Sequence, residues 1–85
     1  DTIFVPEAPM FYVSGEVQRA GGYRLAGDTT VRSAIAMGGG LTPRGTLRGL
    51  KIHRRLPDGT ITKLDARLTD RVEAGDVVEV REGFF

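Results

Sequence analysis

Apolar positions in residues 29–41 recur with the period of an α-helix. The residues that share one stripe, at i, i+3, i+4 and i+7, are Val31, Ala34, Ile35 and Gly38. Asp28, Thr29 and Thr30 precede the stripe and are candidate N-caps. Gly38 is predicted to take the left-handed conformation that ends many helices, and Pro43 prevents continuation soon afterwards. The pattern predicts a short helix of about two turns with one buried face.

Alternation of apolar and polar residues elsewhere predicts β-strands. The predicted strands are residues 11–17, 23–25, 50–55, 61–64 and 77–80. Gly21 and Gly22 are predicted to form the turn of a first hairpin, and the Pro-Asp-Gly run at 57–59 the turn of a second. The valine-rich run at 77–80 predicts a central strand buried on both faces. Residues 41–48 are predicted to be irregular, and residues 66–74 to form a loop or a single helical turn.

The order of these elements is hairpin, helix, hairpin, last strand. A single short helix packed across a mixed sheet of four to five strands would cover the apolar face of that sheet. The sequence therefore predicts an α+β fold of the β-grasp type.

Two ends of the chain share a short pattern. Asp1, Ile3, Val5 and Glu7 match Asp76, Val78, Val80 and Glu82 in order and spacing. We interpret residues 1–10 as the end strand of a preceding repeat plus a proline-containing linker, and residues 11–85 as the domain itself. A chance match over four positions is the alternative interpretation.

Length and composition limit what the domain can be. Eighty-five residues allow one small domain with one core. The absence of cysteine excludes a disulfide scaffold, a thiolate zinc site and an iron–sulfur cluster in this segment. Twelve Lys and Arg against eleven Asp and Glu give a net charge of +1, which argues against a strongly nucleic-acid-binding domain.

The residues that could carry catalysis are few. His53 is the single histidine and is predicted to be a solvated residue on the outer face of a strand. Four carboxylates lie close in sequence, namely Asp65, Asp70, Glu73 and Asp76, but their spacing is not that of a calcium loop. Asp76 is instead predicted to cap a turn with Gly75. The glycines at 38–40 follow a helix, whereas a phosphate loop precedes one. We expect no enzyme activity, no metal and no cofactor.

Charge is distributed unevenly along the chain. The basic block consists of Arg44, Arg48, Lys51, Arg54 and Arg55, and the acidic third contains Asp65, Asp70, Glu73, Asp76, Glu79 and Glu82. This pattern predicts two poles, which could be an ordinary solvated surface, could support head-to-tail association, or could contact anionic glycan or nucleic acid. Tyr12 and Tyr23 could stack on sugar rings or pack across strands. The candidate contacts with a neighbouring subunit or a glycan are Arg44, Arg48, Lys51, Arg55, Tyr12 and Tyr23.

Four motifs resemble the SLBB domain, a soluble-ligand-binding β-grasp. They are Val13-x-Gly15-Glu16-Val17, Gly21-x-Tyr23-x-Leu25, Thr30-Val31-x-x-Ala34-Ile35-x-x-Gly38-Gly39-Gly40-Leu41-Thr42 and Gly75-Asp76-x-Val78-x-Val80. The chain departs from the family at Ala20, where the family often has proline. The segment 75–85 is most similar to the periplasmic domains of Wza-type outer-membrane polysaccharide export proteins.

The resemblance implies a function that the residues alone do not give. It implies a non-catalytic module of a capsular or exopolysaccharide export channel. This module would be periplasmic and would belong to an outer-membrane-associated protein. The tandem domains of that protein would stack in a homo-oligomeric ring. The implied partners are neighbouring subunits, a polysaccharide and an inner-membrane polymerisation or export component, with no nucleic acid favoured. Related domains in DNA-uptake and cobalamin-binding proteins imply the alternative, a soluble ligand-binding module for DNA or a small cofactor.

Overall fold

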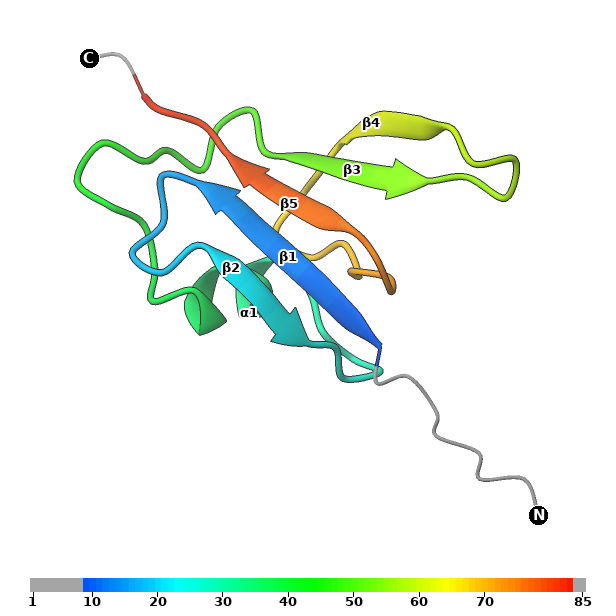
Figure 1. Ribbon diagram of the computed structural model, residues 1–85. Helices are drawn as coiled ribbons and strands as arrows, with labels where there is room; N and C mark the ends of the chain where they lie inside the picture. Colours follow the sequence, from blue (N-terminus) through cyan, green and yellow to red (C-terminus); the bar gives the residue numbers. More distant parts are fainter. Residues whose placement is uncertain (1–8, 84–85) are drawn as a thin grey trace.

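The computed structural model describes residues 9–83, in which five strands form one sheet beside a single helix (Figure 1). The elements are β1 (Met10–Gly15), β2 (Gly21–Arg24), α1 (Val31–Met37), β3 (Lys51–Arg55), β4 (Ile61–Asp65) and β5 (Val77–Val80). The sheet order is β2-β1-β5-β3-β4, with β1 and β5 parallel and the other neighbours antiparallel. The predicted α+β fold, one short helix against a mixed sheet, is confirmed.

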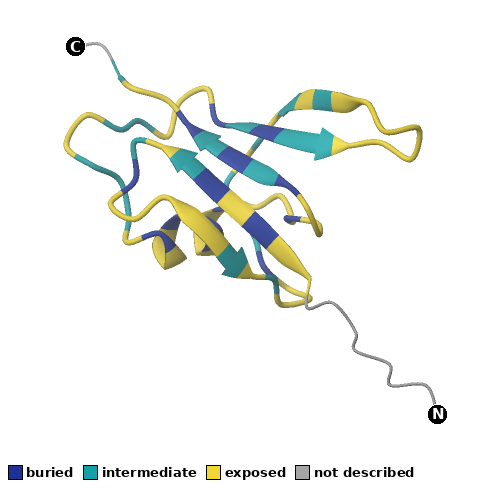
Figure 2. Ribbon diagram, in the orientation of Figure 1, coloured by how far each residue is buried: buried dark blue, intermediate teal, exposed yellow. Residues whose placement is uncertain are grey.

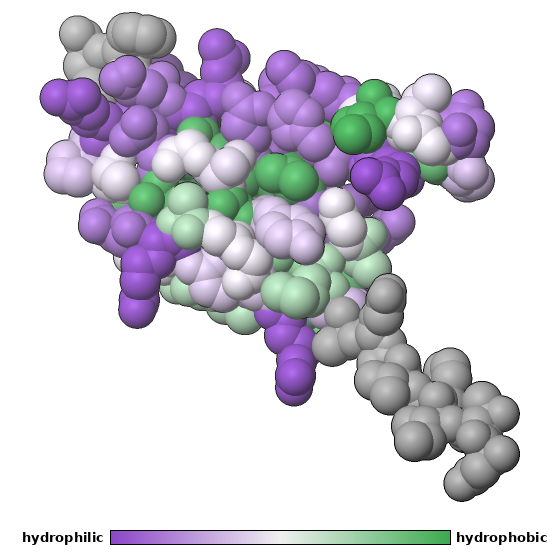
Figure 3. Space-filling view, viewed as in Figure 1, coloured by the Kyte–Doolittle hydropathy of each residue, from purple (hydrophilic) through white to green (hydrophobic). Residues whose placement is uncertain are grey.

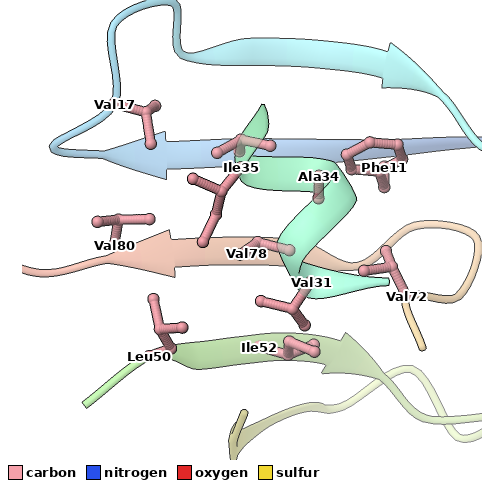
Figure 4. Packing of buried hydrophobic residues seen from close by; sticks show 11 residues of the cluster. Phe11, Val17, Val31, Ala34, Ile35, Leu50, Ile52, Val72, Val78 and Val80 are labelled. Atoms are coloured by element: carbon pink, nitrogen blue, oxygen red, sulfur yellow. The ribbon is translucent and has the colours of Figure 1, made fainter. Parts of the chain in front are cut away.

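The core lies between α1 and one face of the sheet, which we call the helix face. Figure 4 shows side chains of both layers pointing toward each other. The buried core consists of Phe11, Val13, Val17, Val31, Ala34, Ile35, Leu50, Ile52, Val72, Val78 and Val80. Figure 2 shows buried positions alternating with exposed ones along β1, as expected for a strand covered on one side. The opposite side of the sheet carries no element among the described residues, and we call it the open face.

The helix begins and ends much as its pattern predicts. Thr30 is the N-cap, and its side chain accepts a hydrogen bond from the backbone N–H of Ser33 at 3.2 Å. The predicted left-handed conformation of Gly38 is wrong, because Gly38 has φ −78° and its N–H still donates to Ala34 O at 3.1 Å. The chain reverses one residue later, at Gly39, whose φ is +87°.

The first hairpin differs from the prediction. Gly21 and Gly22 lie within β2, opposite Val13 and Tyr12, and residues 16–20 make the connection. The strand β1 ends at Gly15, where the backbone leaves the strand conformation and passes against Val80 of β5. A Cβ at Gly15 would lie 2.0 Å from Val80 O, and φ is +94°.

The second hairpin and the last strand follow the sequence more closely. β3 and β4 pair antiparallel across the predicted turn, and β5 lies centrally between β1 and β3. Burial of β5 on both faces is wrong, since Val78 and Val80 are buried but Val77 and Glu79 are only half-buried. One helix covers one face, so the residues that point to the open face keep contact with water.

The loop of residues 66–74 contributes to the core although it forms no helix. Its backbone passes the start of α1, where the N–H of Val31 donates to Asp70 O at 2.9 Å, and Val72 is buried. The strand predicted at residues 1–5 lies outside the described residues. Within residues 9–83, no helix is long and apolar enough to cross a lipid bilayer.

Candidate binding surface on the open face of the sheet

The strand register places one row of side chains across the open face. Tyr12 lies opposite Gly22 on one side and Val77 on the other, and His53 lies opposite Val77 and Lys63. The row therefore runs through all five strands in the order Gly22, Tyr12, Val77, His53, Lys63. An aromatic ring and an aliphatic residue occupy its centre, and polar groups occupy one end.

A wide groove lies beside this row, between the start of β1 and the projecting β3–β4 hairpin. Its walls include Met10, Tyr12, Val77, Arg55, Leu56 and Ile61. Several of these apolar side chains are unusually exposed, among them Ile61 at 63% and Tyr12 at 45%. Figure 3, which faces the open side, shows apolar areas over the middle of the sheet and near the hairpin, with hydrophilic side chains around them. Exposed apolar surface rimmed by polar groups is typical of a binding site.

Tyr12 packs against a glycine on the neighbouring strand. A Cβ added at Gly22 would lie 2.8 Å from Tyr12 Cε1 and 3.1 Å from Cδ1. The tyrosine ring therefore rests directly on the backbone of β2. The absence of a side chain at residue 22 makes this position of the ring possible.

His53 and Glu79 form a pair at the polar end of the row. His53 Nε2 lies 2.6 Å from Glu79 Oε1, and both side chains are half-buried. This hydrogen bond holds the pKa of Glu79 below its ordinary value, with further help from the charges of His53, Lys63 and Arg81. His53 lies on the predicted face, but the prediction of a simply solvated side chain is wrong because cross-strand pairing gives it a carboxylate partner.

Lys51 is also neutralised within the chain. Its ammonium group forms a salt bridge with Asp65, the residue opposite it on β4. The hydrogen bond and charge of Lys51 lower the pKa of Asp65. Lys51 is therefore a weaker candidate for contact with a ligand than its position in the basic block indicates.

A buried ion pair joins β3 to the turn before β5. Asp76 is fully buried, and it accepts hydrogen bonds from Arg54 Nε at 3.1 Å and Nη2 at 2.9 Å. Arg54 Nη1 lies 3.3 Å from a carboxylate oxygen of Glu73. Asp76 also accepts from the backbone N–H of Glu73 at 2.8 Å, which confirms that it caps the turn. The bond to Asp76 raises the pKa of Arg54.

Sequence reasoning missed this pair, although one signal was available. In the alternation of β3, Arg54 shares the helix face with the buried Ile52. A charged residue at a position that the pattern assigns to the core requires a buried partner. Asp76 is 22 residues from Arg54, and several other acidic residues lie between them, so the pattern does not identify which one is the partner.

The predicted two charged poles are wrong. Three ion pairs, those of Lys51 with Asp65 and of Arg54 with Glu73 and Asp76, connect the basic block to the acidic third inside one chain. The cause is the topology, because β3 pairs with both β4 and β5.

The structure divides the candidate contact residues between three places. Tyr12, Lys51 and Arg55 share the open face by register. Tyr23 instead faces the core side, where its ring centroid is 6.0 Å from that of Phe11 and its hydroxyl donates to Arg19 O. The two remaining candidates, Arg44 and Arg48, lie in the exposed loop before β3.

The arrangement is suited to non-covalent binding. Over residues 9–83, no group of three or more His, Asp or Glu side chains is placed to hold a metal ion. His53 is paired with a carboxylate but has no hydroxyl nucleophile among its hydrogen-bond partners in that range. What the open face offers is an aromatic ring, apolar walls and exposed cations.

The fold and this surface define a small β-grasp module of the ligand-binding class. A family model for the SLBB domain matches residues 10–65, which is more than half of the chain and includes β1 to β4, and the chain belongs to the SLBB domain family. Members of this family are soluble ligand-binding modules. A comparison with curated protein sequences finds no significant match.

Proposed function

We propose that the chain is a non-catalytic periplasmic module of a capsular or exopolysaccharide export protein. In this proposal the parent protein is associated with the outer membrane, forms a homo-oligomeric ring, and works with an inner-membrane polymerisation or export component. The observation that carries the proposal is the asymmetry of the sheet, with one face closed by α1 and the other open and lined by an exposed aromatic ring, apolar side chains and a cation. Further support comes from membership of the SLBB family and from the resemblance of residues 75–85 to export proteins.

The charges that remain unpaired support head-to-tail contact between subunits. Arg44 and Arg48 are exposed and form no salt bridge within residues 9–83. Their loop is fixed to the segment after β5, because Gly83 N–H donates to Arg44 O at 2.8 Å. Asp28 and Asp70 are two of the exposed acids that likewise lack a salt bridge in this range, and they lie by the start of α1, whereas the arginines follow its end. Contact between these arginines and those acids of a neighbour would join two different surfaces, which is the heterologous contact that closes into a ring.

The test uses the full-length protein with Arg44→Glu and Arg48→Glu. Each exposed pair contributes only about 0–1 kcal/mol and is weakened by salt, so we expect smaller assemblies by sedimentation, with the largest effect at low ionic strength. Arg55→Glu, which makes the same charge change on the open face of the sheet, is the control and should leave the rings intact.

A charge swap makes this test more specific. If Arg44 and Arg48 meet Asp28 and Asp70 of a neighbour, adding Asp28→Arg and Asp70→Arg should restore the rings. Rings that are unchanged in the double arginine variant would rule out this contact.

A further inference from the structure

We propose that the open-face groove binds acidic sugar residues of a polysaccharide, with Tyr12 as the stacking platform and Arg24, Arg55 and Lys63 as the cationic margin. The inference rests on the proposed function and extends it by naming the chemistry of the ligand and the residues that recognise it. It concerns a surface separate from the loop arginines.

The Tyr12 ring is a pre-organised platform. One side of the ring rests on Gly22, where even a methyl group would lie 2.8 Å from the ring, while 45% of the residue stays exposed. Among residues 9–83 the one aromatic pair is Phe11 with Tyr23, so Tyr12 has no aromatic partner there. A ring already packed on one side loses less conformational freedom than a fully solvated ring when a flat, apolar surface such as the face of a sugar stacks on it.

Three cations lie on the same face of the sheet as this platform, and one of them, Arg55, lines the groove. Arg24 lies opposite Met10, Arg55 opposite Ile61, and Lys63 opposite His53. All three are exposed, and none forms a salt bridge with another described residue. Strands in a sheet lie about 4.8 Å apart, so the three spacings from Tyr12 on β1 to Lys63 on β4 span ~14 Å. This length fits a stretch of glycan rather than one sugar.

The acidic side chains near the groove already form salt bridges with basic side chains of the same chain. Glu79 is paired with His53, Asp65 with Lys51, and Glu73 with Arg54. The charge left for a ligand is therefore positive. Carboxylates suit this margin because arginine can hold them with two parallel hydrogen bonds. The three free cations and net charge of +1 fit the sparse charge of an acidic glycan better than the dense charge of nucleic acid.

The experiment titrates the 85-residue chain, labelled with ¹⁵N, with three probes: an oligogalacturonate, a neutral glucan oligosaccharide of equal length, and a single-stranded oligonucleotide. We expect the oligogalacturonate to shift the amides of β1, β3 and β5 along the Tyr12 row, and to bind about tenfold more tightly than the neutral sugar. Tighter binding of the oligonucleotide, equal binding of the neutral sugar, or no shifts at millimolar oligogalacturonate would each overturn the proposal.

Variants separate the platform from the charge. Tyr12→Ala and Arg55→Glu should each weaken oligogalacturonate binding about tenfold, while Tyr12→Phe should retain it because the ring remains. Gly22→Ala should weaken binding by displacing the ring, although Tyr12 itself is unchanged. Arg32→Glu, with the same charge change as Arg55→Glu but on α1 behind the sheet, is the matched control and should bind normally.

The outcomes distinguish this inference from the proposed function. Loss of rings in the loop-arginine variants together with no glycan binding would overturn the inference alone. Glycan binding through Tyr12 and Arg55 with no effect of the loop arginines on assembly would overturn the proposed ring contact and support the inference.

Discussion

Individual residues on β3 show how one strand serves two surfaces. Ile52 and Arg54 point to the helix face, where the first joins the core and the second neutralises the buried Asp76. His53 points to the open face and bonds Glu79, and Arg55 lies on that face at the groove. Alternation predicts these two sets of positions. The identity of each charged partner depends on which strands become neighbours in the sheet. The alternation of residues in a single sequence does not predict the order of the strands.

The pair of His53 and Glu79 leads to a prediction about pH. Because folding lowers the pKa of Glu79, the pair stabilises the fold above the carboxyl's unfolded value of about 4.3, and this stabilisation is lost as the pH falls through the lower folded value. In the His53→Ala variant the Glu79 pKa should rise. Carboxyl NMR titration measures it directly.

Asp58 is an internal control in the same titration. Its pKa is lowered by hydrogen bonds from Thr60, in the β3–β4 turn away from His53. The pKa of Asp58 should be the same in the wild type and in the His53→Ala variant. If the pKa of Glu79 is also unchanged in the variant, His53 is not the partner of Glu79.

At the scale of elements, the regular parts of the fold were predictable and the junctions were not. The helix, the β3–β4 hairpin and β5 follow periodicity and turn residues. The first hairpin was misread because Gly21 and Gly22 resemble a turn, whereas glycine at residue 22 is needed to make room for Tyr12. The left-handed end of α1 was placed one residue early, since three consecutive glycines do not mark which one has the positive φ.

The junction between β3 and β5 should depend on Arg54 and Asp76 together. Arg54→Met leaves a fully buried carboxylate without its cation, and we expect a loss of about 3 kcal/mol in the free energy of unfolding. The double variant Arg54→Met, Asp76→Asn should lose less than the sum of the single variants. Denaturant unfolding of the four proteins measures the coupling.

The surface salt bridge between Lys51 on β3 and Asp65 on β4 provides the comparison. In the pair of Lys51 and Asp65 the acid side chain is 89% exposed, so Lys51→Met should lower the free energy of unfolding much less than Arg54→Met does. Equal losses for Arg54→Met and Lys51→Met would show that the buried pair does not hold this junction.

At the scale of the molecule, the sheet divides the domain into a side that packs in the core and an open side that we propose as the binding surface. α1 and the loop of residues 66–74 close the helix face, and the open face keeps its aromatic ring and cations accessible. Tyr12 and Arg55 were predictable as candidates from their residue types. The location of Tyr12 and Arg55 on one face was not predictable, because it depends on the strand order β1-β5-β3. The separation of Arg44 and Arg48 from this face was not predictable either.

Polysaccharide secretion tests most directly the claim that the open face is the working surface of this module. Cells lacking the full-length protein would receive the wild type, the Tyr12→Ala, Arg55→Glu double variant, or the Arg32→Glu control. We predict that the double variant reaches normal protein levels and assembles normally, because both side chains are exposed, yet secretes severalfold less polysaccharide, while the control secretes normally. Undiminished secretion by the assembled double variant would contradict the account.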